Sequence, residues 1–337
     1  MAATLHDVAR LAGVSIKTVS NVINDYPHIR ATTRSKVEQA IAELGYTPNL
    51  TARNLRSGKT GAIALAVPDL ALAYFAELAA TIIAEAERAG VVVLVEQTGG
   101  DREREAQLLR SPRLKLTDGV IFSPLGMGQD DRDLLEVSYP LVMLGERIFD
   151  APVDHVTMRN VEAARAATEH LLASGRRRIA IVGAHEGEVI GSAGLRLRGH
   201  REALDAAGIP WDEDLIGYTT MWHRSNGART MRELLDRGVP FDAVFGLNDT
   251  LALGAMRVLQ EAGIHVPDDV AVIGWDDLDE AQYSIPSLST VDPGQEWIAA
   301  TAVSTLLDRI AGRESGPPRL LLADYRVVAR ESAPAPA

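Results

Sequence analysis

The chain has 337 residues, of which 46% are hydrophobic and 24% charged, a composition typical of a globular protein with a substantial core. It contains no cysteine, which excludes disulfides, thiolate metal sites and cysteine nucleophiles. No apolar segment is long enough to span a bilayer, and Asp7 and Arg10 interrupt any secretory signal, so we expect a cytoplasmic protein that binds no membrane.

The charge is unevenly distributed along the chain. The formal net charge is −12, yet residues 1–60 carry eight basic and four acidic side chains. Affinity for nucleic acid depends on local neutralisation of phosphates rather than on the charge of the whole chain. A basic head on an acidic body therefore makes nucleic acid a candidate partner of the head, while the alternative is a solvated basic surface.

Three short helices are predicted in the head, over residues 5–11, about 15–24 and about 33–44. Thr4 and Ser15 are placed to cap the first two, and Gly13 gives the turn between them its backbone freedom. This pattern indicates a helix-turn-helix. Apolar residues at helical spacing are expected to form its core: Leu5, Val8, Ala9, Ala12, Val14, Val19, Val22, Ile23, Val37, Ile41 and Leu44.

The second helix carries the candidate DNA contacts. Ile16, Lys17 and Asn21 are expected on its outward face near the N-terminal end, where a recognition helix meets base edges. Smaller hydroxyl side chains and a basic residue of the third helix suit phosphates, namely Ser15, Thr18, Ser20 and Arg34. The alternative is an ordinary solvated helix face.

From Gly61 onward the pattern changes to short apolar runs separated by helical stretches. The runs are AIALAV, VVVLV, DGVIF, PLVML, RIAIVG, DAVFG and DVAVIG. Crossover helices are expected over residues 75–89, 161–174, 197–207, 225–236 and 250–262. Such alternation is typical of buried parallel strands in a doubly wound α/β fold.

The segments LHDVARLAGVSIKTVSNVIND and ELGYTPNLTARNLRSGKTG resemble the head and hinge of LacI-type transcriptional regulators, and the resemblance continues through AVFGLNDTLALGAMRVL and VPDDVAVIGWDDLDEAQYSIPSLSTV. It implies an N-terminal all-α helix-turn-helix head plus an α/β body of two doubly wound Rossmann-like lobes, similar to a periplasmic binding protein. It also implies a homodimer that binds double-stranded operator DNA, with a near-palindromic sequence, and a small-molecule effector.

The domain organisation follows from this resemblance and from the change of pattern. The expected segments are a DNA-binding domain (1–48), a hinge helix or linker (49–60), an effector-binding and dimerisation domain (61–331) and a disordered tail (332–337). Within the third segment, lobe 1 is expected to take about 61–158 and 290–318, and lobe 2 about 159–289 and 319–331. The final ESAPAPA lacks heptads, so assembly is expected to stop at the dimer.

The hinge has little apolar surface and is expected to fold only on DNA. The resemblance places Leu55 as a wedge that enters the minor groove, and Ala52 is small enough for two hinge helices to approach each other. Asn49 and Arg53 are candidate groove or phosphate contacts. For Leu55 the alternative is a linker residue that packs on the body.

Candidate effector contacts follow the strands of the body, where a doubly wound sheet binds ligands. They are Asp69, Tyr74, Phe75, Ser123, Arg196, Trp222, Asn248 and Asp276. The resemblance places Arg196, Asn248 and Asp276 at effector positions. Trp222 and Tyr74 suit stacking on a sugar ring, and a plain core role is an equal alternative for both.

Catalytic patterns find little support. The GKT at residues 58–60 lacks the preceding glycine of a P-loop, no GxSxG occurs, and the histidines are too far apart in sequence for a local zinc motif. We therefore expect no enzyme, no cofactor and no metal. The leading hypothesis is a repressor controlled by a sugar effector, a mono- or oligosaccharide; the alternatives are a stand-alone sugar-binding protein or a cleft hydrolase.

Overall fold

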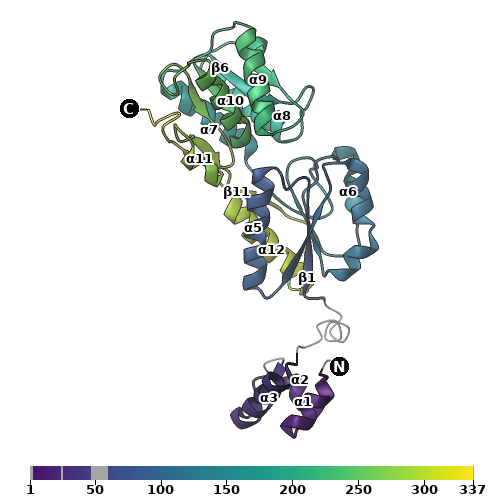
Figure 1. The fold of residues 1–337 in the computed structure, drawn as a ribbon. Helices are drawn as coiled ribbons and strands as arrows, with labels where there is room; N and C mark the ends of the chain where they lie inside the picture. Colours follow the sequence, from purple (N-terminus) through teal and green to yellow (C-terminus); the bar gives the residue numbers. More distant parts are fainter. Residues whose placement is uncertain (1–2, 24–25, 47–59, 337) are drawn as a thin grey trace. The chain divides into compact units, whose positions relative to one another are not determined.

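A computed structural model describes residues 3–23, 26–46 and 60–336 of the chain (Figure 1). Two compact units are present, Met1–Thr60 and Gly61–Ala337, which we call the head and the body. Among the described residues, no helix is long and apolar enough to cross a membrane.

The head contains the three predicted helices, α1 (Leu5–Ala12), α2 (Ile16–Ile23) and α3 (Ala31–Leu44). Thr4 and Asp7 form a reciprocal capping box at the start of α1, and Gly13 ends that helix with φ of 65°, a conformation that favours glycine. The predicted core is confirmed, because every residue expected in it lies in one apolar cluster, which Tyr46 and Ala40 complete.

Lobe 1 of the body is built on a six-stranded parallel sheet, in the order β11-β5-β4-β3-β1-β2. Its strands are β1 (Ala62–Val67), β2 (Val92–Gln97), β3 (Val120–Phe122), β4 (Leu141–Leu144), β5 (Asp154–Met158) and β11 (Leu320–Ala323). Helices α5 (Ala73–Arg88) and α12 (Gln295–Ile310) cover one face and α6 (Arg102–Leu109) the other (Figure 1). Alternate residues of β1 serve the two faces, since Leu65 packs in the cluster with α5 and α12 while Ala66 packs with α6.

Lobe 2 has a four-stranded parallel sheet in the order β7-β6-β8-β9. The strands are β6 (Ile179–Ala184), β7 (Ile216–Tyr218), β8 (Ala243–Gly246) and β9 (Ala271–Ile273). Two pairs of packed helices accompany it, α7 (Asn160–Ala173) with α8 (Ser192–Ala206), and α9 (Arg224–Asp236) with α10 (Asp249–Glu261). Ile181 packs in the cluster of the first pair and Val182 in that of the second, so this sheet is also covered on both faces. The chain is therefore doubly wound in both lobes, as predicted.

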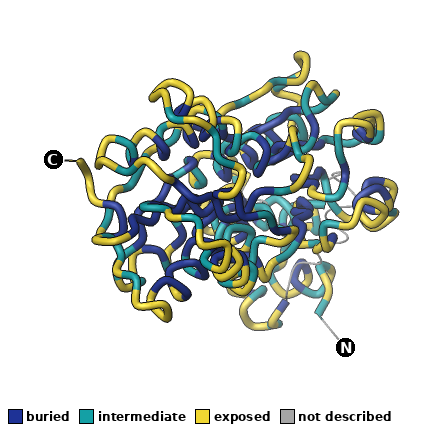
Figure 2. The backbone as a smooth tube through the Cα atoms, turned by 90° about the horizontal axis from the view of Figure 1, so that it is seen from above, coloured by how far each residue is buried: buried dark blue, intermediate teal, exposed yellow. Residues whose placement is uncertain are grey.

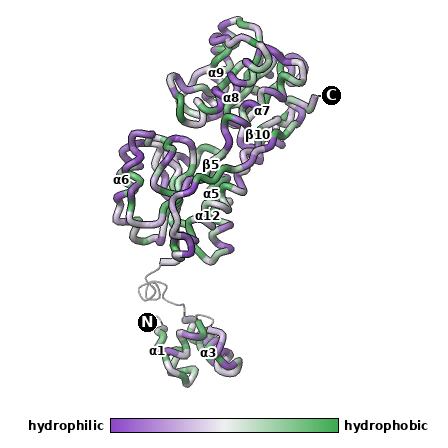
Figure 3. The backbone as a smooth tube through the Cα atoms, turned by 180° about the vertical axis from the view of Figure 1, so that it is seen from behind, coloured by the Kyte–Doolittle hydropathy of each residue, from purple (hydrophilic) through white to green (hydrophobic). Residues whose placement is uncertain are grey.

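Smaller elements connect these layers. They are the 3-10 turns η1 (Pro112–Leu116), η2 (Gln129–Leu135) and η3 (Glu213–Leu215), the short helix α11 (Asp279–Tyr283), and the antiparallel strands β10 (Thr290–Asp292) and β12 (Arg326–Val328). In Figure 2 the buried segments run through the interior of the body and exposed ones form many of its loops. Figure 3 colours the chain by hydropathy, and hydrophobic segments lie within both lobes of the body.

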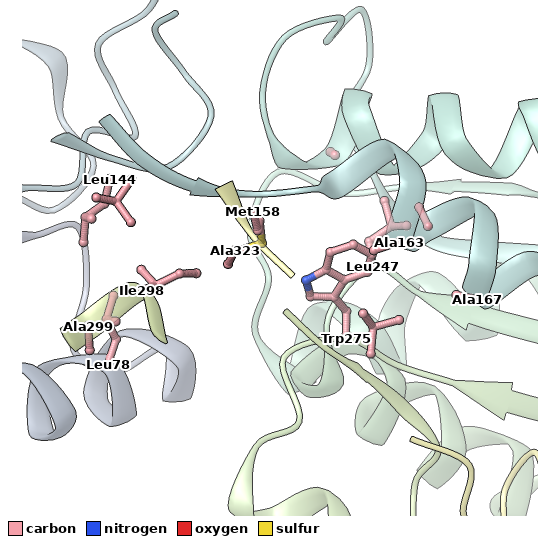
Figure 4. Packing of buried hydrophobic residues seen from close by; sticks show 14 of the residues in the cluster. Leu78, Leu144, Met158, Ala163, Ala167, Leu247, Trp275, Ile298, Ala299 and Ala323 are labelled. Carbon is pink, nitrogen blue, oxygen red and sulfur yellow. The ribbon is translucent and has the colours of Figure 1, made fainter. Parts of the chain in front are cut away.

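One continuous apolar cluster extends across both lobes where the chain passes between them. Figure 4 shows Ile298 and Leu78 on the lobe 1 side, Met158 and Ala323 in the middle, and Trp275 on the lobe 2 side. Trp275 is the largest fully buried side chain among the described residues. The lobes therefore share a core near the connecting segments.

Three expectations about the body are wrong. Residues 319–331 do not all belong to lobe 2, because β11 pairs in parallel with β5 of lobe 1. The tail is not disordered from residue 332, since Ser332 and Ala333 are buried. The Ser332 hydroxyl donates to the carbonyl of Val272 in β9 at 2.6 Å, and the Val272 N–H donates back to the Ser332 carbonyl. Small side chains let this segment lie against the strand.

The third is the VVVLV run, expected as a buried strand. It forms the edge strand β2, where Val92, Leu94 and Val95 are all exposed. Apolar composition alone does not distinguish a central strand, which is buried inside the sheet, from an edge strand whose apolar side chains are exposed at an interaction surface.

Candidate functional site

The N-terminal end of α2 presents a polar surface on the head. The Ser15 hydroxyl accepts the N–H of Thr18 at 3.1 Å, which caps the helix, and the two hydroxyls lie 2.9 Å apart. Ser15 and Lys17 are exposed, while Val19 and Val22 are buried in the head core. The helix therefore keeps one face in the core and leaves its polar face available.

The other candidate DNA contacts are more enclosed. Ile16 was expected to face outward, but it is half-buried and packs against the head core, because the turn before α2 brings it over that cluster. Ser20 and Asn21 are also half-buried, and the Arg34 guanidinium donates to the Tyr26 carbonyl at 3.3 Å. The hinge candidates lie outside the described residues: Asn49, Ala52, Arg53 and Leu55.

The body encloses a cavity of about 130 Å³ between its two lobes. Most of its lining is apolar, with a few convergent charged groups, which is the usual make-up of a small-molecule site. The structure brings together seven of the eight predicted effector residues in this lining: Tyr74, Phe75, Ser123, Arg196, Trp222, Asn248 and Asp276. Asp69 does not join them, because its carboxylate turns back to accept the N–H of Ala71 at 2.9 Å.

Arg196 occupies the buried floor of the cavity, with an exposed fraction of 3%. Its Nε donates to Asn160 Oδ1 at 2.9 Å, and its Nη1 donates to the carbonyl of Leu247. The guanidinium lies over the rings of Trp275 and Trp222, 4.1 and 5.2 Å from their centroids. Burial lowers the pKa of Arg196, while nearby carboxylates raise it. A rigid, fixed cation of this kind can orient ligand hydroxyls.

Asp276 lies beside this cation under backbone strain. Its φ of 115° falls in a region that side-chain-bearing residues rarely adopt. Burial raises the pKa of Asp276 to about 7, and the charge of Glu146 also raises it, while Arg196 opposes the shift. The carboxyl is therefore poised to change its protonation state near neutral pH.

Aromatic and amide groups complete the lining. The Trp222 indole N–H donates to the Gly183 carbonyl at 2.9 Å, which fixes the ring at the cavity, and Tyr74 lines the opposite lobe. Asn248 caps α10, accepting the Leu251 N–H at 2.8 Å. Trp222 and Tyr74 are half-buried, and they line the cavity while they also pack against the apolar core.

Sequence reasoning missed several charged or polar lining residues: Glu146, Arg147, His185, Glu188 and Ser192. A signal was present for three of them, because Glu146 and Arg147 closely follow β4 and His185 follows β6, at the strand ends that bind ligands. Glu146 joins the lobes: it accepts from Thr157 of lobe 1 at 2.9 Å and from Ser192 of lobe 2 at 2.6 Å. Within the described residues, no cluster of side chains has the make-up of a metal site.

Comparisons with known proteins agree with this architecture. A family model described as bacterial regulatory proteins of the lacI family matches residues 4–49, and one described as a periplasmic binding protein-like domain matches residues 168–333. The chain is 38% identical over 342 residues to the HTH-type transcriptional regulator CelR of Thermobifida fusca, covering 98% of this chain and 98% of that protein.

Two solved structures extend the comparison. A complex of the transcriptional regulator CelR with cellobiose is 33% identical, with a TM-score of 0.72, over 98% of this chain and 99% of that one. The lac repressor dimer bound to operator and the anti-inducer ONPF is 30% identical, with a TM-score of 0.84, over 99% and 100% of the two chains. The chain belongs to the LacI family of transcriptional regulators. It is a DNA-binding regulator and not an enzyme.

Proposed function

We propose that this LacI-family regulator is a repressor that binds a palindromic operator as a homodimer, and that a sugar in the cavity of the body changes its affinity for that operator. The observation that carries the proposal is the cavity itself, because both lobes supply its charged and aromatic lining. A ligand that contacts both lobes binds one lobe arrangement better than another, and this preference is what an effector requires.

The DNA contacts are assigned to the polar face and N-terminal end of α2. The exposed Lys17 donates to base edges, and Ser15 and Thr18 are directed to phosphates. The remaining proposed contacts in the head and hinge are Ile16, Ser20, Asn21, Arg34, Asn49, Ala52, Arg53 and Leu55. The proposed domains are 1–48 for DNA binding and 49–60 for the hinge. The protein acts in the cytoplasm, where its operator lies.

The sugar assignment follows from the chemistry of the lining. Trp222 and Tyr74 offer ring faces for the apolar side of a pyranose, while Arg196 and Asp276 supply a charged donor and a carboxylate acceptor for its hydroxyls. The solved complex of the relative CelR contains cellobiose, which supports the same class of ligand. A stand-alone sugar-binding protein would not need the head, and a hydrolase would need a committed acid and base.

The homodimer is supported by an apolar surface around β2. It is formed by the exposed large side chains of this edge strand, namely Val92, Leu94 and Val95. Exposed apolar groups gathered on one edge mark an interface, and the lac repressor structure similar to this chain is a dimer. Leu94→Asp is expected to give monomers by light scattering, with a loss of operator affinity, whereas a dimeric variant would exclude this surface.

The experiment that tests the function is an electrophoretic shift with a palindromic promoter fragment, repeated over neutral sugars. We expect a shifted complex whose stability changes with one class of sugar. If the protein shifts the fragment but no sugar alters the shift, the proposed control by a sugar is wrong, while the proposed operator binding stands. Absence of any shift over a library of random palindromes would contradict operator binding itself.

A further inference from the structure

Three charged or polar residues form a group that joins the lobes at the cavity. Arg147 follows β4 of lobe 1, while His185 and Glu188 lie in the loop between β6 and α8 of lobe 2. The Glu188 Oε2 accepts from Arg147 Nη1 at 2.8 Å and from His185 Nδ1 at 2.9 Å. We call this group the cross-lobe triad.

Glu188 is held firmly as the centre of the triad. Its second oxygen, Oε1, accepts the backbone N–H groups of Ala193 and Gly194 at 3.1 and 3.2 Å. Burial raises the pKa of Glu188, but the hydrogen bond and charge of His185, the hydrogen bond from the Gly194 N–H and the charge of Arg147 outweigh it, so that the pKa lies below its ordinary value. The carboxylate is therefore ionised and makes four contacts, which fix the positions of its two side-chain partners.

A glycine permits this close arrangement. Gly191 has φ of 127°, and a Cβ placed on it would lie 2.5 Å from Glu188 Oε1 and 2.9 Å from Arg147 Nη1. Any larger residue would push the carboxylate and the guanidinium away from each other or from the loop. The loop is thus shaped to bring the charges of the two lobes together.

The charges of the triad are paired, but its hydrogen bonds are incomplete. Because His185 donates through Nδ1, its Nε2 carries a lone pair in the neutral ring. This Nε2 and the Nε–H of Arg147 are buried, and neither has a hydrogen-bond partner in the described part of the chain. Buried polar atoms without partners are rare and costly, so each calls for an explanation.

A hydroxyl group accepts one hydrogen bond and donates another, so it can satisfy both the Nε–H donor of Arg147 and, in the neutral ring, the Nε2 acceptor of His185. An anion would satisfy the donor only. Positive charge is also not in excess, because Glu188 compensates Arg147, while Glu146 and Asp276 accompany Arg196. The lining therefore disfavours a phosphate or a carboxylate and favours a neutral ligand.

We propose that the cross-lobe triad is a subsite for a hydroxyl group of a neutral polyhydroxylated effector, in which Glu188 positions Arg147 and His185 for that contact. The proposal rests on the proposed function, since it takes the cavity as the effector site. The two nitrogen atoms are buried, but their side chains line the cavity, so the hydroxyl reaches them after a small displacement that leaves the contacts of Glu188 in place. Since one partner is in lobe 1 and the other in lobe 2, the hydroxyl bridges the lobes.

Calorimetry on the full-length protein tests this subsite, with cellobiose, glucose and glucose 6-phosphate as probes. We expect a neutral sugar to bind, and glucose 6-phosphate to bind more weakly than glucose. Glu188→Gln, Arg147→Gln and His185→Ala are each expected to weaken binding of that neutral sugar by roughly tenfold or more. Glu186→Gln makes the same chemical change at an exposed position two residues away and should leave the affinity unchanged.

Monodeoxy analogues of the sugar that binds separate recognition from a merely structural role. For the wild type, one analogue should lose affinity, because it lacks the hydroxyl that meets the triad. Glu188→Gln should bind that analogue and the parent sugar with equal affinity. For the other analogues, its loss of affinity relative to the parent sugar should be the same as in the wild type.

The outcomes distinguish the two levels of the argument. Two results would refute the subsite but leave the effector cavity standing. One is that Glu188→Gln binds the sugar as tightly as the wild type does. The other is that every deoxy analogue loses the same factor of affinity in Glu188→Gln as in the wild type. Tighter binding of glucose 6-phosphate than of glucose would make the triad an anion site and overturn the proposal. If no sugar binds the wild type, the sugar effector and the subsite both fall.

Discussion

The polar face of α2 and the cavity of the body use charge in opposite ways. On α2, Lys17 is exposed and carries its charge into solvent, while the helix itself is held by Val19 and Val22 in the head core. In the cavity, Arg196 is buried, and its charge is compensated by Asp276 and Glu146. A polyanion such as DNA is attracted by exposed cations. A small neutral ligand is instead bound by fixed, compensated dipoles that a hydroxyl can join. The two surfaces therefore suit two different classes of partner.

The largest effect that would sharpen this comparison is expected from Arg196→Ala. Removing this guanidinium leaves Asp276 and Glu146 without their compensating charge and abolishes the contacts to Asn160 and Leu247. We expect effector affinity to fall by about a hundredfold or more, with operator affinity retained. Arg198→Ala, on the exposed side of α8, is the matched control and should behave like the wild type. Loss of operator binding together with the response, in a folded protein, would contradict the assignment.

A second effect concerns the head and should leave the cavity untouched. Lys17→Ala is expected to change base preference in the half-site, with each lost base contact costing about 1–3 kcal/mol. Lys36→Ala removes another exposed lysine, from α3, and should lower affinity without changing the preferred bases. Selection from random operators measures both. Identical half-sites for the wild type and Lys17→Ala would disprove base readout by this residue.

The third prediction is a pH dependence of effector binding. A ligand hydroxyl that donates to Asp276 favours the ionised carboxylate, so binding lowers a pKa that lies at about 7 in the free protein. Binding below this pKa must then release a proton, and affinity should rise by about tenfold between roughly pH 6 and 8 before levelling off. Asp276→Asn should remove the slope. Titration calorimetry over this range would refute the assignment if the wild type gave a flat profile.

The smallest effect is expected at the capping box of α1. Thr4→Ala removes the hydroxyl that accepts from Asp7 N and donates to its carboxylate, and should destabilise the first turn by about 1 kcal/mol. Thr4→Ser keeps the hydroxyl and serves as the control. Hydrogen exchange of the full chain should become severalfold faster over residues 4–12 in the alanine variant alone. Equal exchange in the two variants would show that the cap does not hold this helix.

The head could be predicted almost completely from the sequence because its signals are local. Gly13, the capping residues and the spacing of Val19 and Val22 all lie within a turn or two of the element they define. The exceptions were Ile16 and Asn21, which were expected to face outward but are half-buried, because helical spacing gives the face of a residue but not how far neighbouring segments cover it.

The body could be predicted in outline, but not where polar residues are buried or where the lobes join. Strand β5 was missed because its sequence, DHVTM, is too polar to indicate a buried strand. Its polar residues are satisfied by distant partners: Asp154 by Arg309 and Arg319, and Thr157 by Glu146. Arg309 and Arg319 each lie more than a hundred residues from Asp154 in the sequence. No local sequence pattern can therefore indicate these ion pairs.

The same reason explains what was missed in the cavity. Arg196, Asn248 and Asp276 were predicted through a family resemblance, and the structure places them in one lining. Arg147 and Glu188 were not predicted, because their pairing depends on how two lobes meet and not on either segment alone. The sequence showed charged residues after strands, and only the fold showed which of them face each other.

The central claim is that the cavity and the DNA-binding surface are coupled through the arrangement of the lobes. The most direct test is calorimetry of sugar binding to the full-length protein, with and without saturating operator. Linkage requires that operator change sugar affinity by the same factor as sugar changes operator affinity, typically a coupling of about 1–3 kcal/mol. The account predicts that these two factors are equal in the wild type. In Arg196→Ala, operator should no longer change sugar affinity, and sugar should no longer change operator affinity. Sugar affinity that is identical in the presence and absence of operator would contradict it.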